Sequence, residues 1–249
     1  MAAKLLIGLA MMLAAAFARA DEITLTSGEW RPYLSEQLPH YGVLSRIVSE
    51  AFALEGVTVR YTFRPWARAI AEAQQGRVQG SVVWSIGAPG SSRNRDFYFS
   101  DLVYEDQSGF FHRKDFPFTW TNINDLPKRY KVGGVAGYEY AFEKLPGVNI
   151  DRAPSDELAM RKLLAGRFEV FPSSQGVGMY VLRTRFTPEE AARIAYHPGS
   201  FTKTRYFLIL PRSLASSKRH LELFNKGLRR LRESGRYGQY LADLEAGRY

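Results

Sequence analysis

The chain contains no cysteine among its 249 residues. Disulfide bonds, zinc–thiolate sites and cysteine nucleophiles are therefore excluded outright. Burial of apolar side chains must stabilise the fold by itself, and a chain of this length can bury a core large enough to do so.

Histidines are few and long basic runs are absent. His40, His112, His197 and His220 are far apart and never share the spacing of a metal site. The formal net charge is +9, but no run of five or more basic residues occurs. Scattered charge of this kind argues against a nucleic-acid partner. We expect no metal and no cofactor.

No catalytic motif is present either. The segment GAPGS, residues 87–91, lacks the G-x-S-x-G order of a nucleophile elbow. The segment GVAGYEY, residues 134–140, has too few glycines for a phosphate loop, and no Lys-Ser/Thr pair follows it. Carboxylates such as Asp101 and Glu105 are not marked as a close pair. We therefore expect no catalytic residue.

One long apolar run occurs, at the N-terminus. Lys4 precedes the run from Leu5 to Phe17, and Ala18-Arg19-Ala20 has the small-x-small form of a cleavage site. The run is too short to span a bilayer. We predict a signal peptide at residues 1–20, cleaved near Ala20–Asp21, and a periplasmic mature chain; an uncleaved membrane anchor is the alternative.

Strand and helix patterns alternate along the rest of the chain. Strands are expected at 23–28, 57–63, 81–85, 97–99, 130–136, 148–152, 168–171 and 205–210, and helices at 43–54, 65–76, from 155 to 166, 216–233 and 238–245. This order repeats and implies two α/β units with mainly parallel sheets. Residues 107–125, between the units, have no clear period and are interpreted as a crossover.

Side chains suited to a small ligand follow the predicted strands of the first unit. Trp30 and Tyr33 follow the first strand, Trp84 ends the third, and Arg93 comes soon afterwards in a predicted loop. Two α/β lobes that meet at a cleft place their strand ends around a shared pocket. There an arginine offers a carboxylate a planar fork of donors, and aromatic rings supply apolar walls. Arg95 is interpreted as a surface or inter-lobe charge.

The chain resembles the family 3 solute-binding proteins of bacterial periplasms, which typically feed polar amino acids to ABC transporters. The segments TSGEWRPY, GVLSRIVSEAF, PWARAIAEAQQGRVQG, SSRNRDFYFSDLVY, DLPKRYKVGGVAGYEY, LLAGRFEVF and TKTRYFLILPRSL carry the resemblance over the whole mature chain. It implies the two-lobed type II fold, with residues 21–110 plus 201–249 in lobe 1 and 111–200 in lobe 2. It also implies a monomer that delivers its ligand to an ABC permease.

The resemblance also assigns residues. In the family, an arginine seven residues before the serine of an FS pair clamps the ligand α-carboxylate, and here Arg93 precedes Ser100 in that way. The chain departs from the pattern where the family has an aspartate for the ligand ammonium, because Ser174 stands there. Tyr138, after Gly137, replaces a threonine that helps to hold the carboxylate. An ordinary α-amino acid is therefore less expected than a carboxylate or another small polar compound.

The predicted function is capture of a small polar, amino-acid-like or carboxylate ligand between the lobes. The predicted ligand-binding residues are Arg93, Trp30, Tyr33, Trp66, Trp84, Ser85, Tyr138, Ser174 and Gln175. Two alternatives use the same scaffold. One is an enzyme like a cyclohexadienyl dehydratase, with Glu169 or Glu139 as the acid; the other is a ligand-sensing module for a membrane signalling protein.

Overall fold

A computed structural model represents the chain. It describes residues 21–136, 138, 140–197, 199 and 201–249, apart from the side chains of Asp125 and Ala141. The predicted signal peptide, Gly137 and Glu139 therefore lie outside the described residues. Within the described part, no helix has the length and apolar character needed to cross a membrane.

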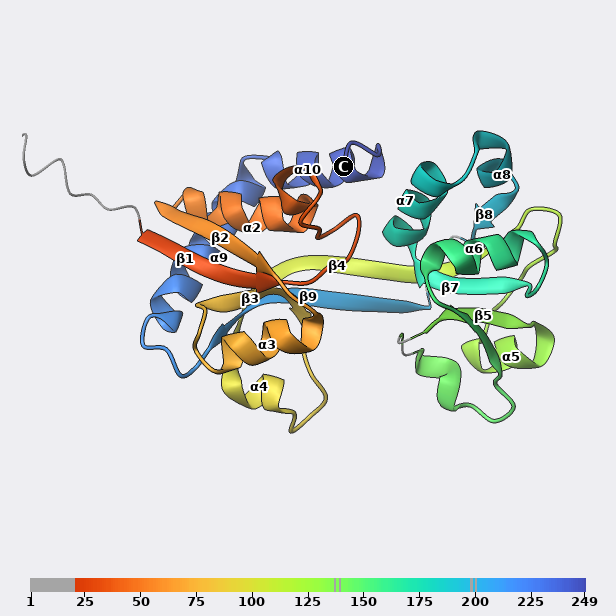
Figure 1. The fold of residues 1–249 in the computed structure, drawn as a ribbon, viewed down its shortest axis with the longest axis horizontal. Helices are drawn as coiled ribbons and strands as arrows, with labels where there is room; N and C mark the ends of the chain where they lie inside the picture. The colour runs from red at the N-terminus through yellow and green to blue at the C-terminus, as the bar shows by residue number, and fades with distance from the viewer. Residues whose placement is uncertain (1–20, 137, 139, 198, 200) are drawn as a thin grey trace, which may run out of the picture.

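A mixed sheet runs through the whole molecule (Figure 1). Its strand order is β2-β1-β3-β9-β4-β7-β5-β6, and β8 pairs with β4 beside this path. The strands are β1 (Asp21–Ser27), β2 (Val57–Phe63), β3 (Gly80–Ser85), β4 (Phe97–Arg113), β5 (Val132–Val135), β6 (Ile150–Ala153), β7 (Val170–Ser174), β8 (Ile194–Tyr196) and β9 (Thr202–Pro211).

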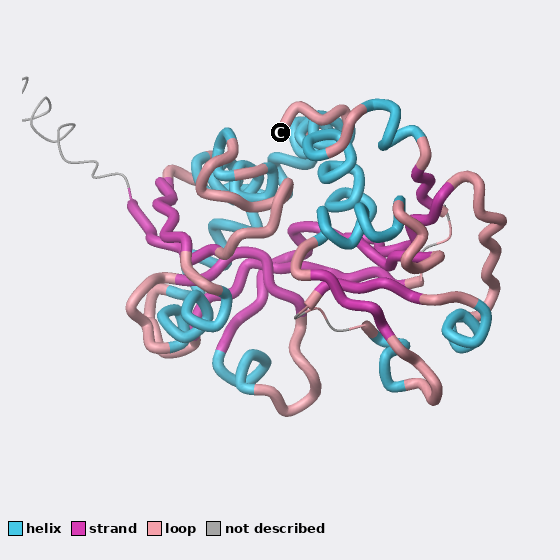
Figure 2. The backbone as a smooth tube through the Cα atoms, turned by 45° about the vertical axis from the view of Figure 1, so that its right-hand side comes forward, coloured by secondary structure: helices cyan, strands magenta, loops and turns pink. Residues whose placement is uncertain are grey.

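The long strands β4 and β9 connect two lobes (Figures 1 and 2). They pair antiparallel along most of the length of β9, from Phe97 opposite Pro211 to Ser108 opposite Thr202. The outer strands are parallel: β2, β1 and β3 in lobe 1, and β6, β5 and β7 in lobe 2. The predicted two-lobed α/β fold is thus present, with parallel strands in each lobe and antiparallel strands at the centre.

Helices cover both faces of the sheet. They are η1 (Pro39–Tyr41), α2 (Val43–Ala53), α3 (Trp66–Gln74), α4 (Ser92–Asp96), η2 (Ile123–Asp125), α5 (Leu126–Arg129), η3 (Ala141–Lys144), α6 (Asp156–Leu164), α7 (Gln175–Arg185), α8 (Pro188–Ala192), α9 (Ser217–Glu233) and α10 (Arg236–Glu245). In lobe 1, α2 and α10 lie above the sheet in Figure 1, α9 passes behind β1, and α3 and α4 lie below the sheet. The sequence did not predict α4, α5, α7 or α8.

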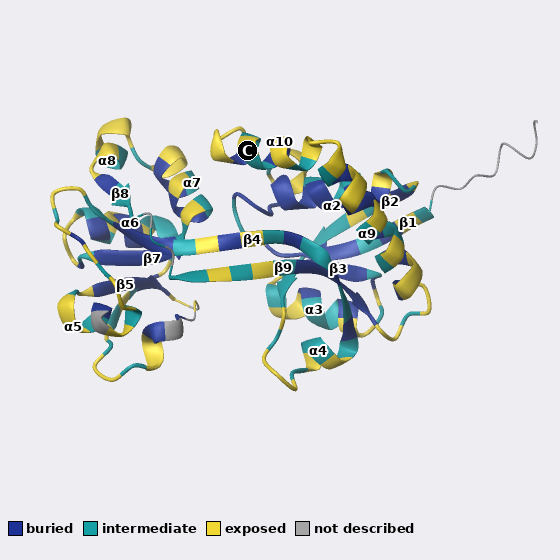
Figure 3. Ribbon diagram, turned by 180° about the vertical axis from the view of Figure 1, so that it is seen from behind, coloured by how far each residue is buried: buried dark blue, intermediate teal, exposed yellow. Residues whose placement is uncertain are grey.

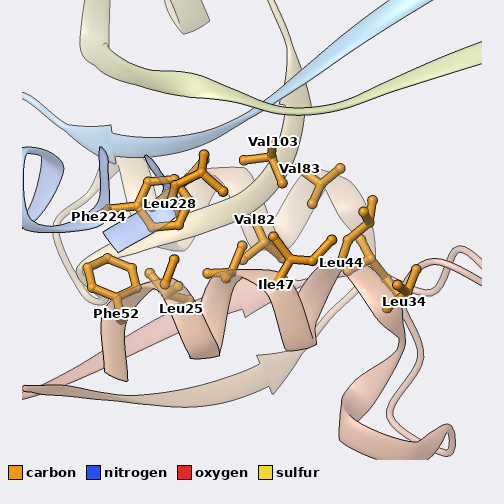
Figure 4. Packing of buried hydrophobic residues seen from close by; sticks show 14 of the residues in the cluster. Leu25, Leu34, Leu44, Ile47, Phe52, Val82, Val83, Val103, Phe224 and Leu228 are labelled. Carbon is orange, nitrogen blue, oxygen red and sulfur yellow. The ribbon is translucent and has the colours of Figure 1, made fainter. Parts of the chain in front are cut away.

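The main core of lobe 1 lies between the sheet and the helices α2 and α9 (Figure 4). Phe52 of α2 packs against Phe224 of α9 with ring centroids 5.1 Å apart. The two helices approach closely at Gly227, where an added Cβ would lie 1.8 Å from the carbonyl oxygen of Ala51. This packing gives the strand ends of lobe 1 a rigid support.

Lobe 2 has apolar clusters on both faces of its sheet. Phe110 and Phe111 are adjacent on β4, so their side chains point to opposite faces and enter different clusters. Exposed residues occur on the bridge between the two buried bodies: Glu105 and Gln107 in the middle of β4, and Lys203 and Arg205 in the first half of β9 (Figure 3). The expected lobe boundaries, 21–110 plus 201–249 and 111–200, stay a prediction; Phe110 and Phe201, which these bounds assign to lobe 1, pack in a cluster of lobe 2.

Candidate ligand-binding cleft

A cavity of about 580 Å³ lies beside the bridge of β4 and β9, with side chains of both lobes in its wall. This volume is typical of pockets for small molecules. Seven of the side chains predicted from the sequence line it: Trp30, Trp66, Trp84, Ser85, Arg93, Tyr138 and Ser174. Lobe 1 contributes the first five and lobe 2 the last two, so a ligand in this cleft can contact both lobes.

Arg93 supplies a positive charge to the cleft. Its Nη1 donates hydrogen bonds to the carbonyl oxygen of Ser85 at 2.9 Å and to the Ser85 hydroxyl at 3.3 Å. Its guanidinium carbon lies 4.7 Å from the centre of the Trp84 ring. Burial lowers the pKa of Arg93. Among the described residues no carboxylate forms an ion pair with it, and its buried Nε has no hydrogen-bond partner.

A short helix, not the predicted loop, carries Arg93. The Ser91 hydroxyl accepts from the backbone N–H of Asn94 and caps α4. The Asn94 side chain, in turn, bonds to both the N–H and the carbonyl oxygen of Gly87 at 2.9 Å. One turn of helix is too short to produce a periodic pattern, so Ser91 was the only local signal. Arg95, on the same turn, is exposed and pairs with Asp96 at 2.7 Å.

Aromatic rings form the walls of the lobe 1 side. Trp84 meets Trp66 edge to face at 5.2 Å, and its indole N–H donates to the Ser81 hydroxyl at 2.7 Å. Trp30 packs against Tyr206 of β9 with ring centroids 4.8 Å apart. Tyr206 lines the cleft from the bridge, although the sequence did not single it out.

An irregularity in β3 lies directly before Trp84. The register with β9 shifts between Ser81 and Trp84. Val83, within this step, has φ 61°, a left-handed conformation that is strained for a β-branched residue. Bulges of this kind reorient the side chains that follow them. Here they are Trp84 and Ser85, which line the cleft.

Asp106 is a cleft residue that the sequence analysis missed. It lies on the bridge strand β4 and is 4% exposed. Its Oδ1 accepts hydrogen bonds from the hydroxyls of Tyr33 at 2.9 Å and Ser174 at 2.7 Å. Burial raises the pKa of Asp106. The available signal was an aspartate one residue before the predicted crossover at 107–125.

Two predicted residues lie outside the cleft wall. Tyr33 is fully buried behind it and reaches the cleft only through its hydroxyl contacts to Asp106 and Ser174. Gln175 is the first residue of α7, is exposed, and lines hollows on that helix. One of these, about 940 Å³ over α7 and α8, is lined by lobe 2 alone. Gln175 lies there because the chain turns from β7 into α7 directly after Ser174.

The lobe 2 wall contains Tyr138 and a nearby carboxylate. The Tyr138 hydroxyl donates to Oδ2 of Asp156 at 3.2 Å, and Ser173 donates to Oδ1 at the same distance. Burial raises the pKa of Asp156. Glu169, proposed above as an acid, comes just before β7, at the opposite end of that strand from Ser174. It accepts the Lys131 N–H and does not line the cleft. No His, Asp and Glu cluster in the described part has metal-site geometry.

The fold has many solved relatives. No protein-family model and no curated protein matches the chain. A histidine kinase sensor domain with similarity to periplasmic binding proteins superimposes with a TM-score of 0.68 at 21% identity, covering 90% of this chain and 96% of that one. The chain has the two-lobed fold of the periplasmic binding proteins.

Other structures with the binding-protein fold are transport proteins. An ancestral cationic amino acid solute-binding protein has a TM-score of 0.68 at 20% identity, covering 94% of this chain and 99% of that one. An amino acid ABC transporter substrate-binding protein from Streptococcus pneumoniae, bound to L-arginine, has a TM-score of 0.65 at 18% identity, covering 92% and 97%. Many neighbours are of this type. At these identities the likeness concerns the fold.

Proposed function

We propose that the protein is a periplasmic solute-binding protein that captures a small ligand bearing a carboxylate and delivers it to an ABC transporter. The observation that carries this is Arg93, a half-buried guanidinium with no carboxylate partner among the described residues, in a cleft between two lobes. A bidentate pair with a carboxylate is the strong interaction open to such a group. The transport proteins that share the fold support the role.

Capture follows from the two-lobed geometry. Arg93 holds the carboxylate on lobe 1, and Trp84 and Trp30 cover the rest of the ligand. Tyr138 and Ser174 approach from lobe 2. A ligand that contacts both lobes binds the closed conformation better than the open one and therefore shifts the population towards it.

A thermal-shift screen over amino acids, organic acids, amines and small peptides tests this proposal. Ligand at 100 times its dissociation constant stabilises the native state by about 2.7 kcal/mol, which raises the melting temperature measurably. We expect carboxylate-bearing compounds among the hits. A screen in which no carboxylate shifts the melting temperature would contradict the proposal.

Calorimetry on two arginine variants tests the anchor. Arg93→Ala should weaken binding of a carboxylate hit at least tenfold, since a hydrogen bond to a charged group contributes about 1.5–3 kcal/mol. Arg95→Ala is the matched control, because Arg95 lies on the same helical turn but is exposed and paired with Asp96. Equal affinities for wild type and Arg93→Ala would rule out Arg93 as the anchor.

The sensor domain among the structural neighbours favours a second role, ligand sensing. The same cleft would then report ligand to a membrane signalling protein rather than deliver it to a permease. Uptake of the ligand and expression of ligand-responsive genes, both measured in a deletion strain, separate the two roles. Deletion of a transport protein abolishes uptake, whereas deletion of a sensor first changes gene expression.

A further inference from the structure

We infer that Asp106 receives a positively charged group of the ligand, such as an amine, and that Tyr33 and Ser174 hold its carboxylate in position for this. The inference rests on the proposed function, since it concerns the same cleft. It extends that function by adding a cation-binding residue on the bridge strand to the anion anchor on lobe 1.

The first argument is position. Asp106 and Arg93 line the same cavity, one from β4 of the bridge and the other from α4. A ligand that pairs with both must carry a negative and a positive group. The cavity volume of about 580 Å³ limits such a ligand to a small molecule.

The second argument is the absence of a counter-charge. The side-chain donors to Asp106 are all neutral hydroxyls: Tyr33 and Ser174 donate to Oδ1, and Tyr104 contributes a third hydrogen bond. Among the described residues no cationic side chain forms an ion pair with it. A buried carboxylate without a counter-ion is unfavourable, and the burial raises the pKa of Asp106 for that reason. A ligand cation would supply the missing charge.

The third argument is how the carboxylate is held. Ser174 is the N-cap residue of α7, yet its side chain makes no cap hydrogen bond. Its hydroxyl donates to Asp106 instead, at 2.7 Å. Gly176 permits this compact arrangement, because an added Cβ would lie 2.1 Å from the Tyr33 hydroxyl oxygen. The carboxylate is therefore oriented from lobe 1 and lobe 2 together.

The aromatic surroundings are also suited to a cation. Trp30 and Tyr206 line the cavity together with Asp106. Burial and the nearby Asp106 charge raise the pKa of Tyr206 to about 12, so its ring stays neutral. Neutral aromatic faces attract cations through their quadrupole, most strongly where water is excluded.

The test uses two matched pairs of probes, 5-aminopentanoate and L-phenylalanine, each compared with the same acid that has hydrogen in place of its amino group. In any pair of which one compound binds, we expect wild type to have the higher affinity for the compound with the amino group. Asp106→Asn should weaken binding of that compound about tenfold or more and leave its partner within about twofold. Asp101→Asn is the control on the same strand, because its carboxylate is partly exposed and pairs with Arg229; it should change neither affinity.

Asparagine keeps the shape of aspartate and an oxygen that accepts from Tyr33 and Ser174, and thermal unfolding of each variant checks that it is folded. Ser174→Ala provides a second variant, which should weaken the amino compound selectively but less. Two results would overturn the inference and leave the proposed function standing. One is an unchanged affinity of Asp106→Asn for the amino compound. The other is a preference of the wild type for the acid that lacks the amino group. If wild type binds no carboxylate at all, the inference and the proposed function are both wrong.

Discussion

Arg93 and Asp106 both lie where burial opposes their charge. Burial lowers the pKa of Arg93 and raises that of Asp106, so neither site is optimised for the stability of the empty protein. Binding sites commonly retain such unfavourable groups because a ligand satisfies them. In this cleft Arg93 and Asp106 can pair with a negative and a positive group of the same ligand.

The pH dependence of the stability should reveal how much the burial of the ionised Asp106 carboxylate destabilises the fold. Its pKa in the folded protein is higher than in the unfolded chain, so the native state binds the proton more tightly. The resulting stabilisation is complete below the unfolded pKa and is lost as the pH rises through the folded pKa. The Asp106→Asn variant has no carboxyl group at this position, so its stability does not fall for this reason as the pH rises. The difference between the melting temperatures, Asp106→Asn minus wild type, should therefore be more positive at pH 7 than at pH 4.

Thermal unfolding at both pH values, without ligand, measures this difference. The tyrosines around Asp106 all have raised pKa values and do not titrate in this range: Tyr33, Tyr104, Tyr196 and Tyr206. The other neighbouring hydroxyl, that of Ser174, is not titratable. The other charged side chains in the adjoining cavities are Glu29, Arg93, Glu105, Arg183 and Glu245, and Glu29 pairs with Arg31. A melting difference that does not vary between the two pH values would contradict the prediction.

At the scale of the elements, glycine decides how closely helices pack. Gly227→Ala would place a Cβ 1.8 Å from the Ala51 carbonyl oxygen, so α2 and α9 must separate. Overpacking of this kind typically costs about 1–3 kcal/mol. Gly238→Ala on α10 meets no heavy atom within 4 Å and should instead stabilise by about 0.5–1 kcal/mol through helix propensity. Denaturant unfolding of both variants measures the two effects; equal effects would refute the packing argument.

Elements with a clear hydrophobic pattern were predicted closely. β2 runs from Val57 to Phe63, as the sequence indicated, and α2 begins at Val43 as expected. Helix α7 was not predicted, because its glycines disfavour a helix on propensity. Both glycines have tertiary reasons. A Cβ at Gly176 would meet the Tyr33 hydroxyl, and one at Gly178 would lie 2.1 Å from the Phe111 ring.

At the scale of the whole molecule, the bridge of β4 and β9 separates two sides. The cleft lies on the side of α4 and α5, and α7 and α10 lie on the other (Figure 1). Rotation of the lobes about the bridge must therefore shorten distances on one side and lengthen them on the other. Ligand that closes the cleft should bring α4 and α5 together and move α7 and α10 apart.

Spin labels on cysteine pairs can measure these opposite changes, since the chain has no cysteine of its own. Ser92 and Arg129 are exposed on the cleft side, and Thr184 and Gln239 are exposed on the other. On addition of saturating ligand, dipolar spectroscopy should show a shorter distance for the first pair and an unchanged or longer one for the second. A shortening of both distances would exclude rotation about the bridge.

The sequence by itself determined the alternation of strands and helices and the two α/β units, and the family resemblance singled out Arg93 by its spacing from Ser100. These depend on periodicity and on local spacing, which a single chain segment carries. The tertiary structure decided the partners of Asp106, because Tyr33 and Ser174 are 73 and 68 positions away from it. No local pattern relates residues so far apart, and only the crossing of β4 between the lobes places them within hydrogen-bond distance.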